Sequence, residues 1–149
     1  MKNVGYLLKE MNLIQLYAWV YAAMFVFVVV LGYIPGFINA DGQLFGLFRI
    51  DPIDDVLHLA SGIWAALAAW TSMRASTLYF KLFGCLYGLD GVIGLIFGQG
   101  YLDGGIFIYG PLPLDWGTKV AANLPHMLIG GTAVVIGFVL SRKLTSQGQ

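Results

Sequence analysis

The stretch Asp51-Pro-Ile-Asp-Asp-Val-Leu-His-Leu-Ala-Ser-Gly62 returns in weaker form as Lys119-Val-Ala-Ala-Asn-Leu-Pro-His-Met-Leu-Ile-Gly130. In both stretches an Asp or Asn is followed, after two residues, by a histidine and, after three more, by a glycine. His58 and His126 are the only histidines in the chain. Because each stretch opens a long apolar run, the repeat predicts two equivalent helix starts in one protein.

The composition of the chain is typical of a membrane protein. Of its 149 residues, 58% are hydrophobic and 11% are charged, whereas an average soluble domain has about 25% charged residues. The net charge of zero gives no support for nucleic-acid binding. Cys85 is the single cysteine, so an intramolecular disulfide is excluded. We therefore expect one integral membrane domain over residues 1–149, with the lipid bilayer as a partner and no nucleic acid.

Four segments of the chain are long and apolar enough to be membrane spans, which take about 20 residues each. They cover residues 12–34, 52–73, 77–97 and 118–140, with Pro35-Gly36 ending the first. The sequence therefore predicts an all-α membrane protein, a bundle of four transmembrane helices.

The distribution of charge predicts the orientation of this bundle. Six of the eight basic residues flank one set of span ends: Lys2, Lys9, Arg74, Lys81, Arg142 and Lys143. Aspartates flank the other set: Asp41, Asp51, Asp54, Asp55, Asp103 and Asp115. Because Lys and Arg concentrate in cytoplasmic loops, we expect both termini and the turn at Arg74 to be cytoplasmic. The expected location is a bacterial inner membrane, with two longer, structured loops outside.

The two outer loops share a short pattern: Asp-Gly, one residue, an aliphatic residue and Phe. It occurs at residues 41–45 and again at residues 103–107. Together with the repeated histidine stretch, this pattern predicts an internal duplication, in which the first two spans match the last two. Two helix pairs of the same orientation would be related by a pseudo-twofold axis along the membrane normal.

Four residues in each stretch step by four, three and four positions, and therefore share one helical face. They are Asp51, Asp55, His58 and Gly62 in the first stretch, and Lys119, Asn123, His126 and Gly130 in the second. Asp51 and Pro52 suit the N-cap and the first position of a helix. If the two faces meet, Asp51 can pair with Lys119 at the outer rim, with the imidazoles facing each other about two turns below.

Asp90 lies inside the third apolar segment, about eight residues or roughly 12 Å from its outer end. His58 and His126 lie at a similar depth in their own segments. Ionisable groups inside a membrane are functional-site candidates. We hypothesise that Asp90, His58 and His126 form one intramembrane polar cluster. The alternative is a neutral Asp90 bonded to a Tyr, Trp or Ser on a neighbouring helix.

Two interpretations of the histidines stay open. Each ring can hydrogen-bond a loop carbonyl and so hold the outer loops to the bundle. Alternatively, His58 and His126 bind a cofactor, either haem iron or the magnesium of a chlorophyll-type tetrapyrrole. The residues that would orient the rings and make room for a flat ligand are Asp55, Asn123, Gly62 and Gly130. A small metal ion held with Asp55 and Asp90 is a further alternative, although the sequence requires neither a cofactor nor a metal.

Small residues and one proline mark the last two segments. Four glycines near one side of the third segment predict a stripe for close helix packing: Gly84, Gly88, Gly91 and Gly98. Pro125 removes the helical hydrogen bond to the carbonyl of Ala121 and predicts a kink in the fourth segment.

The loop Leu44-Phe-Gly-Leu-Phe48 and the two helix starts at residues 55–62 and 123–130 resemble a bacterial family with a domain of unknown function, DUF4383. Its members are small four-span membrane proteins with a twice-repeated Asn-x-x-His-x-x-x-Gly signature. Asp55 stands where Asn is commoner in that family. The resemblance implies the fold and the membrane location, and implies no activity.

The sequence favours a membrane protein without catalytic activity, an accessory or interaction subunit of a larger complex. It contains no nucleophile–base pair, zinc ligand set or phosphate loop, so we expect no enzyme. Other membrane subunits or further copies of the chain would be its protein partners. A cofactor-binding bundle that uses the paired histidines is the first alternative. Transport of protons or a small solute through the layer of Asp90 and the histidines is the second.

Overall fold

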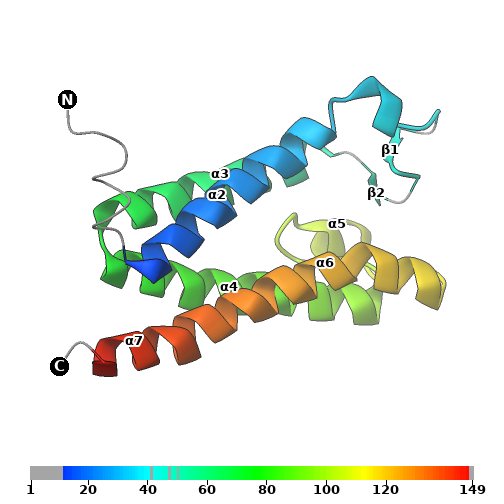
Figure 1. Ribbon diagram of the computed structural model, residues 1–149. Coiled ribbons are helices and arrows are strands. Elements are labelled where there is room, and N and C mark those ends of the chain that lie inside the picture. The colour runs from blue at the N-terminus through cyan, green and yellow to red at the C-terminus, as the bar shows by residue number, and fades with distance from the viewer. Residues whose placement is uncertain (1–11, 41, 47, 50, 148–149) are drawn as a thin grey trace.

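The computed structural model describes residues 12–40, 42–46, 48–49 and 51–147 (Figure 1). The long helices are α2 (Leu13–Leu31), α3 (Pro52–Thr71), α4 (Met73–Phe97) and α6 (Trp116–Val135). Helix α6 continues through a π-helical turn, η2 (Ile136–Leu140), into α7 (Ser141–Gln147). The short elements are the 3₁₀ turn η1 (Pro35–Phe37), the strands β1 (Gln43–Leu44) and β2 (Phe48–Arg49), and helix α5 (Gly105–Tyr109). The predicted all-helical class is confirmed.

Among the residues that the structure describes, three helical segments are long and apolar enough to cross a membrane: Leu13–Leu31, Met73–Phe97 and Trp116–Leu144. Helix α3, the second predicted span, is 20 residues long but is not among them. Its first two turns carry Asp54, Asp55 and His58, which lower its hydropathy. The fourth membrane crossing therefore stays a prediction.

The long helices form two antiparallel pairs (Figure 1). Helix α2 packs against α3, and α4 packs against α6. The pairs are joined by Ser72, which is the C-cap of α3 and the N-cap of α4. Its extended backbone ends one helix, and its hydroxyl accepts a hydrogen bond from the N–H of Ala75 at 3.1 Å to start the next.

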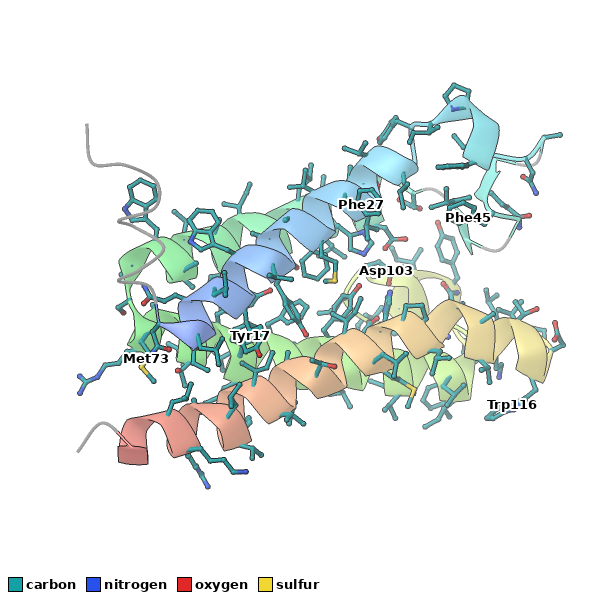
Figure 2. The ribbon with its side chains drawn as sticks, viewed as in Figure 1. Tyr17, Phe27, Phe45, Met73, Asp103 and Trp116 are labelled. Atoms are coloured by element: carbon teal, nitrogen blue, oxygen red, sulfur yellow. The ribbon has the colours of Figure 1, made fainter. Side chains whose placement is uncertain are left out.

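The two ends of the helical bundle carry different short elements. The start of α2, the Ser72 turn and α7 lie at one end, while the β1–β2 hairpin and α5 lie at the other (Figure 1). Met73 and Trp116 mark these opposite ends in Figure 2. We call them the Ser72 end and the loop end. Lys2, Lys9 and Asp41 lie outside the described residues.

Aromatic rings pack the two pairs together. Tyr79, Phe83 and Tyr87 step by four along α4, and successive ring centroids are 5.2 and 4.9 Å apart. Phe25 of α2 meets Phe83 and Tyr87 edge-on, at 5.4 and 5.8 Å. All four side chains are at most 6% exposed, so this cluster is the core between the pairs.

The glycine stripe of α4 packs against α6, as predicted for Gly84 and Gly91. A Cβ added at Gly84 would lie 2.7 Å from the backbone nitrogen of Val134, and one at Gly91 would lie 2.9 Å from that of Met127. Gly98 does not belong to the stripe. It takes the left-handed conformation (φ +82°) that ends α4.

The two loops at the loop end are structured differently. The first forms a two-stranded antiparallel hairpin, in which Leu44 pairs with Phe48. The second contains α5, and the N–H of Leu112 donates to the carbonyl of Phe97 at 2.8 Å. The shared Asp-Gly pattern therefore does not produce a shared loop structure, and the predicted duplication stays a prediction.

Candidate functional site

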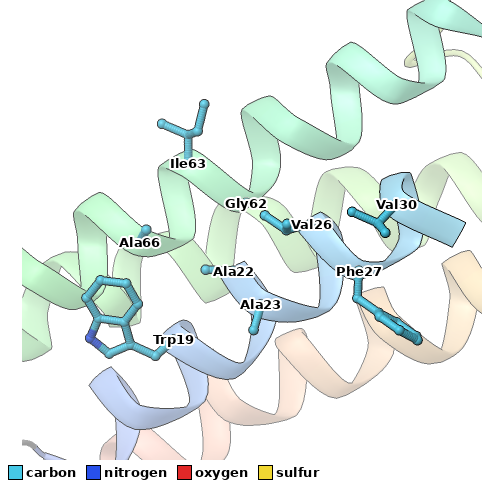
Figure 3. Close-up of a pocket in the computed structure, with 9 residues that line it drawn as sticks. All are labelled: Trp19, Ala22, Ala23, Val26, Phe27, Val30, Gly62, Ile63 and Ala66. Atoms are coloured by element: carbon cyan, nitrogen blue, oxygen red, sulfur yellow. The ribbon is translucent and has the colours of Figure 1, made fainter. Parts of the chain in front are cut away.

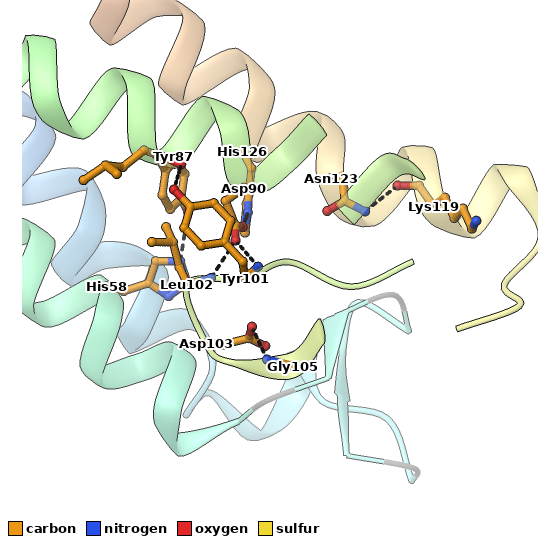
Figure 4. A network of polar contacts seen from close by, with 11 residues as sticks. His58, Tyr87, Asp90, Tyr101, Leu102, Asp103, Gly105, Lys119, Asn123 and His126 are labelled. Atoms are coloured by element: carbon orange, nitrogen blue, oxygen red, sulfur yellow. Dashed lines mark hydrogen bonds and ion pairs between the residues drawn. The ribbon is translucent and has the colours of Figure 1, made fainter. Parts of the chain in front are cut away.

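Asp90 lies in a layer of polar side chains between the two helix pairs, near the loop end (Figure 4). Its side chain is 4% exposed. One carboxylate oxygen, Oδ2, lies 2.9 Å from Nδ1 of His126. The other, Oδ1, accepts hydrogen bonds from the backbone N–H groups of Tyr101 and Leu102 at 2.7 and 2.9 Å. A carboxylate held by several N–H donors is a strongly bonded anion.

These contacts require the chain to fold back after α4. Asp90 precedes the last residue of α4 by seven positions, or roughly 10 Å along the helix axis. The loop returns alongside the helix, and the hydroxyl of Tyr101 donates to the carbonyl of Leu86 at 3.0 Å. Irregular backbone at this depth needs internal hydrogen-bond partners. Asp90 supplies an acceptor for two of its N–H groups.

Gly100 makes the close approach of the loop sterically feasible. A Cβ at this position would lie 2.5–2.8 Å from the three carboxyl atoms of Asp90. Any larger residue would therefore push the loop away from the carboxylate that binds it. The hydroxyl of Tyr101 carries its proton at neutral pH, as tyrosine hydroxyls do, and so can donate the bond to Leu86.

His126 is oriented by Asp90 and by an aromatic ring. Because a carboxylate only accepts, Nδ1 of His126 carries the proton of their hydrogen bond. The imidazole also stacks on Tyr87, with centroids 4.5 Å apart and an interplanar angle of 30°. The pair thus fixes both the tautomer and the plane of His126.

His58 joins the layer through Tyr87. Its Nε2 lies 3.2 Å from the Tyr87 hydroxyl, and its ring stacks on Phe25 with centroids 5.7 Å apart. The structure therefore brings Asp90 and His126 into direct contact and links His58 to them by way of a tyrosine. Sequence reasoning missed Tyr87. The available signal was its position three residues before Asp90, on the same face of α4.

Asp55 and Asn123 do not orient the neighbouring histidines, in contrast to the prediction. Asp55 accepts a hydrogen bond from the Tyr33 hydroxyl at 2.6 Å, which ties the start of α3 to the end of α2. Asn123 donates from Nδ2 to the carbonyl of Lys119 at 2.9 Å, within its own helix. Each side chain is bonded to a partner other than the imidazole one turn away.

The predicted pairing of Asp51 with Lys119 is also wrong. Lys119 donates from Nζ to the carbonyl of Ile96 at 2.9 Å and so binds the C-terminal turn of α4. Asp51 instead caps its own helix, accepting from the N–H of Ile53 at 2.8 Å. Its predicted role as N-cap, with Pro52 in the first turn, is confirmed.

Gly62 and Gly130 serve helix packing within each pair. A Cβ at Gly62 would lie 3.2 Å from the Cβ of Phe25 in α2. One at Gly130 would clash with the backbone nitrogen of Gly88 in α4. The space beside both glycines is thus occupied by the neighbouring helix, and a flat ligand would have to displace it.

Further acidic groups border the layer. Asp54 of α3 lies within electrostatic range of Asp103, Asp90 and His126. The carboxylate of Asp103 accepts a hydrogen bond from the N–H of Gly105 at 2.9 Å. Across the described residues, no three His, Cys, Asp or Glu side chains are grouped as metal ligands would be. Asp55 and Asp90 in particular bind different partners, so the proposed small-metal site has no geometric support.

A separate apolar groove of about 570 Å³ lies between α2 and α3 (Figure 3). It is lined by Trp19, Ala22, Ala23, Val26, Phe27, Val30, Gly62, Ile63 and Ala66. Such a lining suits hydrocarbon chains and offers almost no polar group for chemistry. The polar layer therefore remains the candidate site.

The fold and the apolar helix surfaces define a helical membrane protein. The family model described as "Domain of unknown function (DUF4383)" matches residues 15–139, and the chain belongs to this family. Comparison with curated proteins and with solved structures finds no match.

Proposed function

We propose that the chain is a four-span membrane protein that acts as an accessory or interaction subunit, without enzymatic activity. Support for the fourth crossing comes from connectivity. Helices α2 and α4 both start at the Ser72 end (Figure 1). Helix α3 lies between them in the chain and must therefore carry the chain back from the loop end to the Ser72 end. Twenty residues of helix extend about 30 Å, the thickness of the hydrocarbon core. With the charge distribution, this favours cytoplasmic termini in a bacterial inner membrane.

The observation that carries the non-catalytic proposal is the set of hydrogen bonds that Asp90 accepts. Both carboxylate oxygens are bonded, one to His126 and the other to two N–H groups of the loop. A general base or a nucleophile needs a lone pair directed at a substrate. The arrangement instead supports a structural role, in which the polar layer clamps the second loop onto α4 and α6.

A tetrapyrrole between the histidines has less support, because Tyr87 occupies the position it would need. The tyrosine ring stacks on His126, and its hydroxyl binds His58. A haem with both imidazoles as axial ligands would have to displace this ring and break the Asp90 contact that orients His126.

Transport through the layer also has less support. On the Ser72 side of Tyr87, the space between the helix pairs is filled by buried aromatic side chains: Tyr21, Phe25, Tyr79, Phe80 and Phe83. Their centroids lie 5.0–6.4 Å apart in mainly edge-on contacts. A proton or solute path needs a continuous series of polar groups or water along its length. Of the hydroxyls in this core, that of Tyr21 binds the carbonyl of Ile129 and that of Tyr79 is buried without a hydrogen-bond partner among the described residues, so the two support no continuous path.

Exposed aromatic side chains at the loop end support the interaction role. Phe107, Tyr109 and Trp116 are 79%, 73% and 67% exposed. Large aromatic residues are enriched at protein interfaces and at the membrane–water boundary. A partner subunit that docks at the loop end, at the level of the lipid head groups, would cover them.

Native electrophoresis of the chain at its natural expression level tests this proposal. We expect a complex clearly larger than the 16.2 kDa chain, with a stoichiometric second protein. The double substitution of Phe107 and Tyr109 by Ser should release that protein. A control change of an exposed apolar residue toward the Ser72 end of α2, Val20→Ser, should not. A chain that migrates alone in native membranes would contradict the interaction role.

A further inference from the structure

Lys81 is a cation inside a membrane span, about two helical turns from the end of that span at the Ser72 end. It lies eight residues after Met73, the first residue of α4, or roughly 12 Å along the helix axis. Its side chain is only half-buried within the molecule. A charged side chain at this depth is costly unless it reaches the interface or finds an anionic partner.

The described part of the chain supplies no anionic partner for this cation. Lys81 Nζ lies over the ring of Phe138, 5.3 Å from its centroid, in a cation–π arrangement. The described carboxylates belong to the half of the molecule at the loop end: Asp51, Asp54, Asp55, Asp90, Asp103 and Asp115. Within the described residues Lys81 therefore has no carboxylate beside it, and an anion of the surrounding membrane can supply the opposite charge.

The helix opposite Lys81 is distorted at this point. The π-helical turn η2 crosses α4 here, and a Cβ added at Gly137 would lie 2.8 Å from the backbone nitrogen of Lys81. The hydroxyl of Ser141 donates to the carbonyl of Gly137 at 2.6 Å. Single π-helical turns occur frequently at functional sites. Gly137, inside this turn, lets the two backbones approach beside Lys81 and Phe138.

Two arginines extend this charge toward the Ser72 end. Arg74 precedes Lys81 by seven residues and therefore lies on the same face of α4. Arg142 follows Phe138 by four residues, on the same face of its helix, and both arginines are exposed. Because Lys81 contacts Phe138, the two helix faces lie next to each other. We call the four residues on these faces the basic seam: Arg74, Lys81, Phe138 and Arg142.

We propose that the basic seam binds the phosphate of an anionic phospholipid in the leaflet at the Ser72 end. Arg matches phosphate with paired donors, and Lys adds a point charge. A lipid fits better than a free phosphate, because apolar side chains adjoin the seam. Leu78 and Val139 are 55% and 49% exposed and can contact the acyl chains. Clusters of Lys and Arg at this level of a span are typical of anionic lipid recognition.

Native mass spectrometry of the full chain in detergent tests the seam, with phosphatidylglycerol and phosphatidylcholine of identical acyl chains as probes. We expect the wild type to bind phosphatidylglycerol more tightly. Lys81→Gln should lower that association constant about fivefold, since one basic residue near the surface contributes about that factor. Binding of phosphatidylcholine should stay unchanged.

Further variants distinguish weaker binding caused by loss of a charge from weaker binding caused by misfolding. Arg142→Gln, on an exposed helix end, should weaken phosphatidylglycerol binding similarly, and it carries the test if Lys81→Gln does not fold. Lys81→Arg should retain binding within twofold, and Arg49→Gln, toward the opposite end, should leave it unchanged. Equal wild-type affinity for the two lipids would overturn the proposal. So would unaltered binding in Arg142→Gln, or displacement of the lipid by an equal concentration of glycerol phosphate.

Discussion

Asp90 holds together three segments that are distant in the chain. Its carboxylate joins α4 to His126 of α6 and to the loop at Tyr101 and Leu102. Inside a low-dielectric layer, such charge-assisted bonds are strong, and the loss of one partner leaves the others unsatisfied. The stability of the loop end should therefore depend on this side chain more than on any single apolar residue around it.

Replacement of Asp90 by Ala tests that dependence. The amides of Tyr101 and Leu102 would lose their acceptor, and bonds to a charged group contribute about 1.5–3 kcal/mol. Hydrogen exchange of these amides should therefore accelerate about tenfold or more. Asp103→Ala, a change of equal charge in the same loop, should leave them protected. Unchanged exchange in Asp90→Ala would show that the carboxylate does not hold the loop.

The glycine beside Asp90 offers a second test at the residue scale. Gly100→Ala would place a methyl group 2.5 Å from Oδ1 of Asp90, so we expect a lower melting temperature. Gly131→Ala is the matched control, because nothing lies within 4 Å of its added Cβ. In a helix interior that control should be neutral or stabilising. Equal melting temperatures for the two variants would remove the steric role of Gly100.

The sequence predicted which residues form the polar layer more accurately than it predicted their hydrogen-bond partners. Apolar surroundings made Asp90, His58 and His126 conspicuous, because ionisable groups are rare at such depth. Their partners depend on tertiary contacts that no periodicity encodes. The loop that returns to Asp90 is one example, and the hydroxyl of Tyr87 between the imidazoles is another.

Helix α4 is the element around which the other helices pack. Its glycines face α6, and its stacked rings, from Tyr79 to Tyr87, face α2. Small residues at helical spacing predicted the first of these contacts, because they allow two backbones to approach. The turn at Ser72 and the π-helical turn η2 were not predictable in the same way, since both depend on the helix packed opposite.

A pair of glycines on α4 tests this packing. Gly84→Ala would bring a Cβ to 2.7 Å from the backbone of α6, whereas Gly88→Ala meets its first atom at 3.7 Å. Overpacking typically costs about 1–3 kcal/mol. We expect thermal unfolding in detergent to shift down for Gly84→Ala and to stay nearly unchanged for Gly88→Ala. The reverse order would contradict the close contact between α4 and α6.

At the scale of the whole molecule, two antiparallel helix pairs share an aromatic core, with acidic groups at the loop end and basic groups at the Ser72 end. Composition and apolar segments predicted the all-helical class and the approximate bounds of the helices. The α3 segment remained ambiguous, because Asp54, Asp55 and His58 give its start the hydropathy of a surface helix. Its place between two helices that start at the same end is what favours a fourth crossing.

Labelling of single cysteines with a membrane-impermeant maleimide, in a Cys85→Ser background, tests this topology most directly. Cysteines at Gly36 and Pro113, in the loops at the loop end, should react in intact cells. Cysteines at Thr71 and Gln149 should react only after the membrane is permeabilised. Reaction of Thr71→Cys from the outside, or of Gly36→Cys only from the inside, would contradict the four-span arrangement.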